Sequence, residues 1–66
     1  MKWTELGEQW TQYRGKVKSC WPKLTDSDIH VINGDRLQLI CLLQSKYWIS
    51  KEEAENHIQK FLNSLP

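Results

Sequence analysis

The chain has few of the features that mark membrane-spanning, secreted or redox-active proteins. Its longest unbroken apolar run, "LICLL" at residues 39–43, is far too short to cross a bilayer. The start, "MKWTELGEQW", contains no apolar run that could serve as a signal peptide. The two cysteines, Cys20 and Cys41, do not form a C-x-x-C pair. We therefore expect a cytoplasmic protein with reduced thiols and no membrane partner.

Length and charge exclude further classes of protein. The 66 residues can form one domain, residues 1–66, and a domain of this size buries only about 60% of its unfolded surface. A core this small leaves little room for a deep cavity, so we expect neither an enzyme nor a small-molecule substrate. The net charge of +1 is unlike that of strong nucleic-acid binders, whose pI usually exceeds about 9.

The charges are nevertheless unevenly distributed along the chain. Residues 1–23 carry five cations against two carboxylates, a net charge of +3. Residues 24–66 carry four cations against six carboxylates, a net charge of −2. The chain is therefore mildly dipolar in sequence.

Apolar residues recur at steps of three and four, which predicts an all-α domain of four short helices. No free-standing alternation of apolar and polar residues suggests a strand. Pro22 disfavours a helical conformation at Trp21, so the first helix should end there. Gly15 indicates either a bend in that helix or the close approach of another backbone. The expected helices cover about 3–21, 26–33, 36–47 and 51–64, and their short links favour an orthogonal array.

Polar residues between the expected helices are interpreted as helix ends. Thr25 and Asp28 have the spacing of a capping box, and Asp26 lies in a first turn where the helix dipole favours anions. Gly34 can supply the left-handed conformation that ends the second helix, and Asp35 can cap the third. Ser50 and Glu53 form a full capping box before the last helix. The residues that we expect to have a structural role are Thr25, Asp26, Asp28, Gly34, Arg36, Ser50 and Glu53.

Arg36 has a structural and a functional interpretation. It stands at the start of the apolar face of the third helix, where a guanidinium needs carboxylate partners. Asp26 and Asp28 are the candidates, and such a fork would tie the second helix to the third. Anion binding by Arg36 is the less favoured alternative.

The aspartates, histidines and cysteines do not have the spacing of a metal site or a catalytic site. A calcium loop that began at Asp26 would need glycine at its sixth position and glutamate at its twelfth, but Val31 and Leu37 stand there. The possible zinc ligands Cys20, Cys41, His30 and His57 are isolated rather than paired. We therefore expect no metal, no cofactor and no catalytic residue, and we interpret both cysteines as small packed hydrophobes.

The third expected helix is the most apolar of the four. Leu39, Ile40, Leu43 and Tyr47 form its inner face, which Leu37 and Cys41 should widen. Leu42 falls near the opposite side and should be at least partly exposed. The chain also has four tryptophans, of which Trp3 and Trp48 lie near helix ends and should stay partly exposed.

The stretch "YRGKVKSCWPK", residues 13–23, alternates cations with aromatic residues. Its cations could contact phosphates and Trp21 could stack on a base, which would give weak nucleic-acid binding. A solvated polar helix face is the favoured interpretation, because residues 14 and 16 point in different directions on a helix. The candidate nucleic-acid contacts are Arg14, Lys16, Lys18 and Lys23.

Two long patterns in the chain resemble the CsbD-like family of small bacterial proteins. The first runs from Trp10 through "YRGKVK" and "KLTDSDI" to Leu39, and the second is "Q-x-x-Y-x-ISKEEAE" from Gln44 to Glu55. The resemblance covers almost the whole chain. It implies a short all-helical domain and an abundant cytoplasmic protein of the general stress response, and it brings no established reaction, cofactor or site residue.

The chain departs from the family pattern on one side of the third helix. The resemblance implies glycine where this chain has Cys41 and Trp48, and lysine where it has Leu42. All three changes add apolar surface. Either the helices pack differently here, or Cys41, Leu42 and Trp48 form an additional interaction surface, for example for a homodimer; we favour the second alternative.

Overall fold

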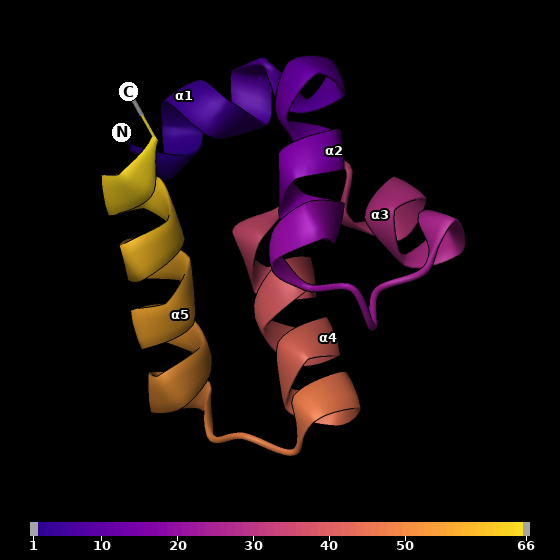
Figure 1. Cartoon of the computed structure of the whole chain (residues 1–66), viewed down its shortest axis with the longest axis vertical. Helices are drawn as coiled ribbons and strands as arrows, with labels where there is room; N and C mark the ends of the chain where they lie inside the picture. Colours follow the sequence, from indigo (N-terminus) through magenta and orange to yellow (C-terminus); the bar gives the residue numbers. More distant parts are fainter. Residues whose placement is uncertain (1, 66) are drawn as a thin grey trace.

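The structure is a computed structural model that describes residues 2–65, and this part of the chain is helical without any strand. The expected all-α fold is confirmed, but five helices are present within residues 2–65 instead of four. In Figure 1, α4 and α5 run side by side in opposite directions, and α1 lies across the end of the molecule near the last turn of α5. The orthogonal array stays a prediction. The helices are α1 (Trp3–Glu8), α2 (Trp10–Cys20), α3 (Asp26–Ile32), α4 (Arg36–Tyr47) and α5 (Lys51–Ser64).

The single helix expected over 3–21 was a wrong prediction, because the chain breaks at Gln9. Gln9 leaves the helical conformation (φ −110°, ψ 33°), and its N–H donates to the carbonyls of both Glu5 and Leu6. Only Gln9 separates α1 from α2, so Leu6 before the break and Trp10 after it both still face the core. The apolar spacing therefore continues across the break and could not reveal it.

A crossing of two glycines holds α1 in its new direction. A Cβ atom on Gly7 would lie 3.0 Å from the Gly34 carbonyl oxygen, and a Cβ on Gly34 would lie 3.0 Å from the Gly7 carbonyl oxygen. The Trp3 indole N–H donates to the same Gly34 carbonyl at 2.8 Å. No atom approaches a Cβ built on Gly15 within 4 Å. The close backbone approach expected at Gly15 therefore occurs at Gly7 instead.

The predicted capping residues Thr25, Asp35 and Ser50 are confirmed, but the full capping box expected at Ser50 and Glu53 is not formed. The Thr25 hydroxyl accepts from the Asp28 N–H at 3.1 Å, and the Asp28 carboxylate accepts from the Thr25 N–H at 3.0 Å. Asp35 caps α4 by accepting from the Leu37 N–H at 3.0 Å. Ser50 accepts from the Glu53 N–H at 3.1 Å, while its hydroxyl rather than its backbone N–H donates to the Glu53 carboxylate. These local bonds fix the starts of α3, α4 and α5.

The end of α3 uses two left-handed residues rather than one. Asn33 (φ 41°) and Gly34 (φ 84°) both have positive φ, so the turn begins one residue before the glycine. The helix accordingly ends at Ile32, close to the expected 33. This turn presents the Gly34 carbonyl to α1.

One apolar core joins all five helices, and no polar or charged side chain within residues 2–65 is buried in it. The Trp21 and Phe61 rings meet in this core with centroids 5.2 Å apart, and the Trp3 and Trp10 rings lie 6.2 Å apart at its α1 end. No helix within residues 2–65 combines the length and the apolar character needed to cross a bilayer. The buried residues are Leu6, Trp10, Val17, Trp21, Leu24, Ile29, Ile32, Leu39, Ile40, Leu43, Ala54, Ile58, Phe61 and Leu62.

The predicted partners of Arg36 were wrong. Its guanidinium pairs with Glu55 at 3.6 Å and so links α4 to α5, not α3 to α4. Asp28 pairs with Lys46 instead, at 2.9 Å between Oδ2 and Nζ. Glu55 lies nineteen residues after Arg36 in the sequence, and only the α4–α5 hairpin brings the two together.

Candidate functional site

The four candidate nucleic-acid contacts do not form one patch. Lys18 is held in an ion pair with Asp26. The Lys16 ammonium lies 5.6 Å from the centroid of the Tyr13 ring. Trp21, the proposed stacking platform, is only 3% exposed. Stacking of a base on Trp21 is therefore incompatible with its position in the core.

Lys23, the fourth of these cations, lies in the loop between α2 and α3. Its ammonium stands 5.0 Å from the centroid of the Tyr47 ring, and its backbone N–H donates to the Tyr47 hydroxyl at 3.2 Å. These contacts join the α2–α3 loop to the last residue of α4. Lys23 therefore has a local structural partner.

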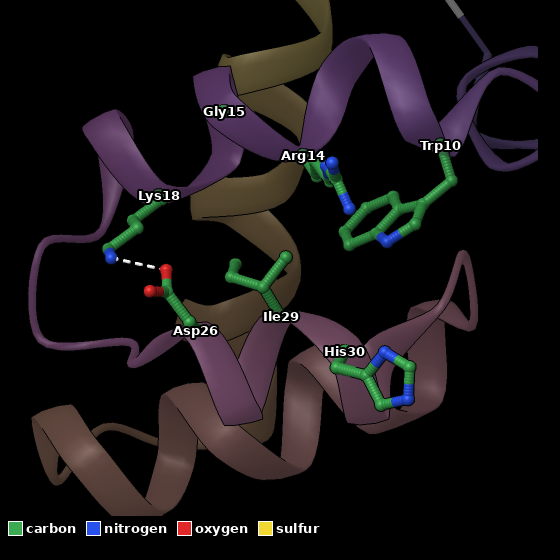
Figure 2. Close-up of a pocket in the computed structure, with 7 residues that line it drawn as sticks. All are labelled: Trp10, Arg14, Gly15, Lys18, Asp26, Ile29 and His30. Carbon is green, nitrogen blue, oxygen red and sulfur yellow. Dashed lines mark hydrogen bonds and ion pairs between the residues drawn. The ribbon is translucent and has the colours of Figure 1, made fainter.

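A hollow of about 470 Å³ lies between α2 and α3 and gathers two of the predicted contacts (Figure 2). Arg14 and Lys18 line it from α2, one helical turn apart, and His30 lines it from α3. The Lys18–Asp26 ion pair closes one end, and the Trp10 indole lies at the other. Because Lys18 is already paired, Arg14 is the principal cation available to a ligand there.

Both aspartates in the first turn of α3 have lowered pKa values. The hydrogen bond and charge of Lys18 lower the pKa of Asp26. The backbone N–H of Thr25, and then the ammonium of Lys46, lower the pKa of Asp28. Both carboxylates are therefore ionised at neutral pH and fasten α3 to α2 and to α4. This is the structural role that the sequence predicted for them, although with lysines rather than Arg36 as partners.

The exposed side of α4 and its C-cap carries no charge. We call its exposed residues the outer face of α4; they are Leu37, Gln38, Cys41, Ser45 and Trp48. Both charged residues of α4, Arg36 and Lys46, lie off this face and are engaged in ion pairs with neighbouring helices. Solvent-exposed helix faces are normally charged or strongly polar, so this face is unusual for a surface.

Trp48 ends the outer face in a strained conformation. It caps α4 with φ 56° and ψ 42°, in the left-handed region, and 90% of its surface is exposed. A non-glycine residue in this conformation costs about 1–2 kcal/mol. Glycine, which the resemblance to the CsbD-like family implies at this position, is the residue that suits such a helix end. The Trp48 side chain is not part of the core, and the bond that this residue makes is from its backbone N–H to the Gln44 carbonyl, at 3.1 Å.

The other two residues of the predicted interaction surface lie on different sides of α4. Cys41 is exposed on the outer face, whereas Leu42 is half-buried and packs against the core. Leu37, expected to widen the inner face, is instead 63% exposed, and that prediction was wrong for Cys41 as well. Sequence reasoning did not assign Leu37, Gln38 and Ser45 to this face. The signal that could have revealed them is the absence of charge at positions 37, 38, 41, 45 and 48, which share one side of the helix.

Both cysteines are free and exposed, which corrects the expectation that they pack as small hydrophobes. Cys20 ends α2, where partial burial raises the pKa of its thiol. Within residues 2–65, no three residues among the histidines, cysteines and carboxylates gather in a way that could hold a metal ion.

Comparison with curated proteins places the chain in a family. It is 44% identical over 54 residues to the UPF0337 protein YjbJ of Escherichia coli K12, which covers 82% of this chain and 78% of that protein. It is 42% identical over 57 residues to YjbJ of Escherichia coli O6:H1, covering 86% and 83%. It is 39% identical over 61 residues to the UPF0337 protein NE2439 of Nitrosomonas europaea, covering 92% of this chain but 65%, just under two thirds, of that longer protein.

No family model and no solved structure matches the chain. The names of the relatives give a family and no biochemical activity. At these identities and coverages, the chain belongs to the UPF0337 (YjbJ) family of bacterial proteins, the family that carries the CsbD-like name.

Proposed function

We propose that this protein is a non-enzymatic member of the bacterial general stress response that acts in the cytoplasm by binding, and that two copies associate through the outer face of α4. The stress role and the compartment are supported by the family resemblance. The mode of action is supported by one observation: an exposed helix face without charge that ends in a strained, 90% exposed tryptophan.

The composition of the outer face is that of an interface centre. Charged residues are depleted at the centres of protein interfaces, where tryptophan is enriched and often carries much of the binding energy. Leu37 and Trp48 supply apolar surface at the two ends of the face. The short side chains of Cys41 and Ser45 lie between them, where two helices could approach closely.

The spacing of these residues suits a two-fold pairing of two α4 helices. Leu37 and Trp48 are eleven residues apart, about 16 Å along a helix. In an antiparallel pair, Trp48 of one copy would lie opposite Leu37 of the other, and the reverse, as an isologous interface requires. Cys41 lies near the midpoint of this span, so the two copies of Cys41 would meet close to the two-fold axis.

Sedimentation over a wide concentration range tests the association. We expect a concentration-dependent dimer in the wild type and a roughly thirtyfold or greater weakening in Trp48→Gly, the size of a typical tryptophan hot spot. Leu37→Lys should weaken it similarly. Val31→Lys is the matched control, because Val31 is also exposed (57%) but lies on α3. A wild type that stays monomeric at millimolar concentration, or a Val31→Lys effect as large as that of Leu37→Lys, contradicts the proposal.

Mild oxidation gives a second, independent test. The proposed pairing predicts a disulfide between two copies of Cys41 under conditions that populate the dimer. Cys20 is the internal control, because it is equally free but lies on α2. Cross-links through Cys20 at the same rate would indicate random collision instead of the proposed pairing.

A second candidate function, weak nucleic-acid binding, is favoured by the α2–α3 hollow of Figure 2. There Arg14 and His30 line a space that ends at the Trp10 indole. Retention on DNA should fall steeply with salt and should weaken in Arg14→Gln. Lys16→Gln is the control, because Lys16 does not line the hollow. Unchanged retention after neutralisation of both Arg14 and Lys18 would remove this candidate.

A further inference from the structure

A second hollow, of about 470 Å³, lies where the end of α2, the end of α4 and the second half of α5 come together. It shares no residue with the α2–α3 hollow or with the outer face of α4. Its volume falls within the range of about 300–1,000 Å³ that is typical of small-molecule sites. It is therefore large enough for a ligand of one or two rings.

Aromatic rings form the inner wall of this hollow. Trp21 and Phe61 line it and pack against each other with centroids 5.2 Å apart. Tyr47 lines it as a half-buried ring, held by the hydrogen bond to its hydroxyl from the Lys23 N–H and by the Lys23 ammonium 5.0 Å from its centroid. Trp21 is only 3% and Phe61 7% exposed, so small parts of these two rings reach the hollow and Tyr47 is the most accessible of the three. Because tertiary contacts already hold these rings, a ligand would meet a preformed surface.

The side chains at the rim of the hollow are cationic or neutral. Lys60 and His57 line the hollow from α5, and no carboxylate lines it. Within residues 2–65, no carboxylate lies within ion-pairing distance of Lys60. The α2–α3 hollow differs in this respect, because the Lys18–Asp26 pair satisfies part of its charge. An anion at the rim would therefore meet an ammonium that has no carboxylate partner among residues 2–65, and a charge-assisted hydrogen bond is stronger than a neutral one.

We propose that this hollow binds small aromatic anions, with a ring of the ligand against Tyr47, beside the small accessible parts of Trp21 and Phe61, and its carboxylate or sulfonate at Lys60 and His57. The chemistry is binding without reaction, so it adds a ligand but no substrate. The proposal stands independently of the self-association of α4, because the two surfaces use different residues.

The position of the two cysteines makes the proposal directly testable. Cys20 lines the hollow, whereas Cys41 lies on the outer face of α4, and both thiols are free and exposed. A ligand in the hollow must shield Cys20 from alkylation and leave Cys41 unprotected. The probe is anilinonaphthalene sulfonate, a fused aromatic ring system with one sulfonate. The experiment uses the whole chain with Trp48→Gly, at a pH near the ordinary thiol pKa of about 8.5, and mass spectrometry to follow each thiol.

We expect saturating probe to slow iodoacetamide alkylation of Cys20 about tenfold and that of Cys41 less than twofold. Phenylnaphthylamine, which has the same rings without the sulfonate, should bind about tenfold more weakly than the probe. The probe itself should bind Lys60→Glu about tenfold more weakly than it binds the protein that keeps Lys60. Lys51→Glu is the matched control, because it makes the same change on α5 outside the hollow. Circular dichroism establishes that each variant is folded.

Several results would overturn the proposal. Equal protection of both thiols, or protection of neither, would place the probe outside the hollow. A Lys60→Glu variant that binds as tightly as Lys51→Glu would remove the role of the ammonium. Absence of any probe binding up to about 1 mM, the weak limit of measurable affinity, would remove the site itself.

Discussion

Exchanging each of two helical glycines for alanine tests the turn that divides the first predicted helix. Gly7 lies in α1 and touches the backbone of Gly34, whereas Gly15 lies in the middle of α2 with open space around it. The two substitutions add the same methyl group to the same type of secondary structure. Only the surroundings differ, so the difference between their effects measures the crossing.

The expected signs are opposite. In Gly15→Ala nothing meets the new methyl within 4 Å, so the free energy of unfolding should rise by about 1 kcal/mol, the helix-propensity difference between alanine and glycine. In Gly7→Ala the methyl would lie 3.0 Å from the Gly34 carbonyl oxygen, which also accepts the Trp3 indole N–H. Overpacking costs about 1–3 kcal/mol. The net loss should therefore be about 1 kcal/mol, and the two variants should differ by about 2 kcal/mol.

Thermal unfolding followed by circular dichroism is sensitive enough for these changes. A change of 1 kcal/mol shifts the midpoint of a domain this small by about 4–8 °C. Gly15→Ala should therefore melt several degrees above the wild type and Gly7→Ala several degrees below it. If Gly7→Ala stabilises the protein as much as Gly15→Ala does, α1 does not cross the α3–α4 turn and the break at Gln9 is not maintained by that contact.

Three further predictions concern the caps and ion pairs. Trp48→Gly should raise the free energy of unfolding of the dilute monomer by about 1 kcal/mol in a urea titration, because glycine adopts the left-handed conformation without strain; a loss of stability would contradict the strain at this cap. The folded pKa of Asp28 is lowered, so its contribution to stability is present above the ordinary pKa of about 3.9 and is lost as the pH falls through the folded value. The urea concentration at the unfolding midpoint should therefore decrease in the wild type as the pH falls below about 4, and it should decrease less in Asp28→Asn. Parallel curves for the two proteins would show that Asp28 does not contribute to this pH dependence. Arg36→Gln should change the free energy of unfolding by less than about 0.5 kcal/mol, since its pair with Glu55 is long and partly exposed; a loss of about 2 kcal/mol in the same titration would show that the pair is stronger than its geometry indicates.

The sequence predicted those parts of the fold that depend on neighbouring residues. Capping requires only a side chain and an amide two or three positions apart, so Thr25, Asp35 and Ser50 could be assigned from their spacing alone. The bounds of α4 and α5 agree with the predicted 36–47 and 51–64 for the same reason.

The parts that depend on distant residues could not be predicted. Gln9 itself carries no signal for a break, and the contact that accompanies the break, Gly7 against Gly34, joins segments far apart in the sequence. The partner of Arg36 likewise depends on the α4–α5 hairpin.

The outer face was missed for a different reason. The spacing predicted the inner residues Leu39, Ile40 and Leu43 correctly, but apolar residues continue around α4 to Leu37 and Cys41, so the spacing did not show where the inner face ends. The neighbouring helices decide it, by packing on Leu39, Ile40 and Leu43. The candidate site on α4 is therefore a property of the tertiary packing and not of the helix by itself.

The fastening of α1 also determines how the native protein opens. A helix of six residues has little stability of its own, so α1 depends on the burial of Leu6, the Gly7–Gly34 crossing and the Trp3 indole bond to stay in place. Releasing these contacts frees residues 3–8 while α4 and α5 keep their shared core. Native-state hydrogen exchange should therefore show the amides of α1 exchanging as one early, cooperative unit, well before global unfolding.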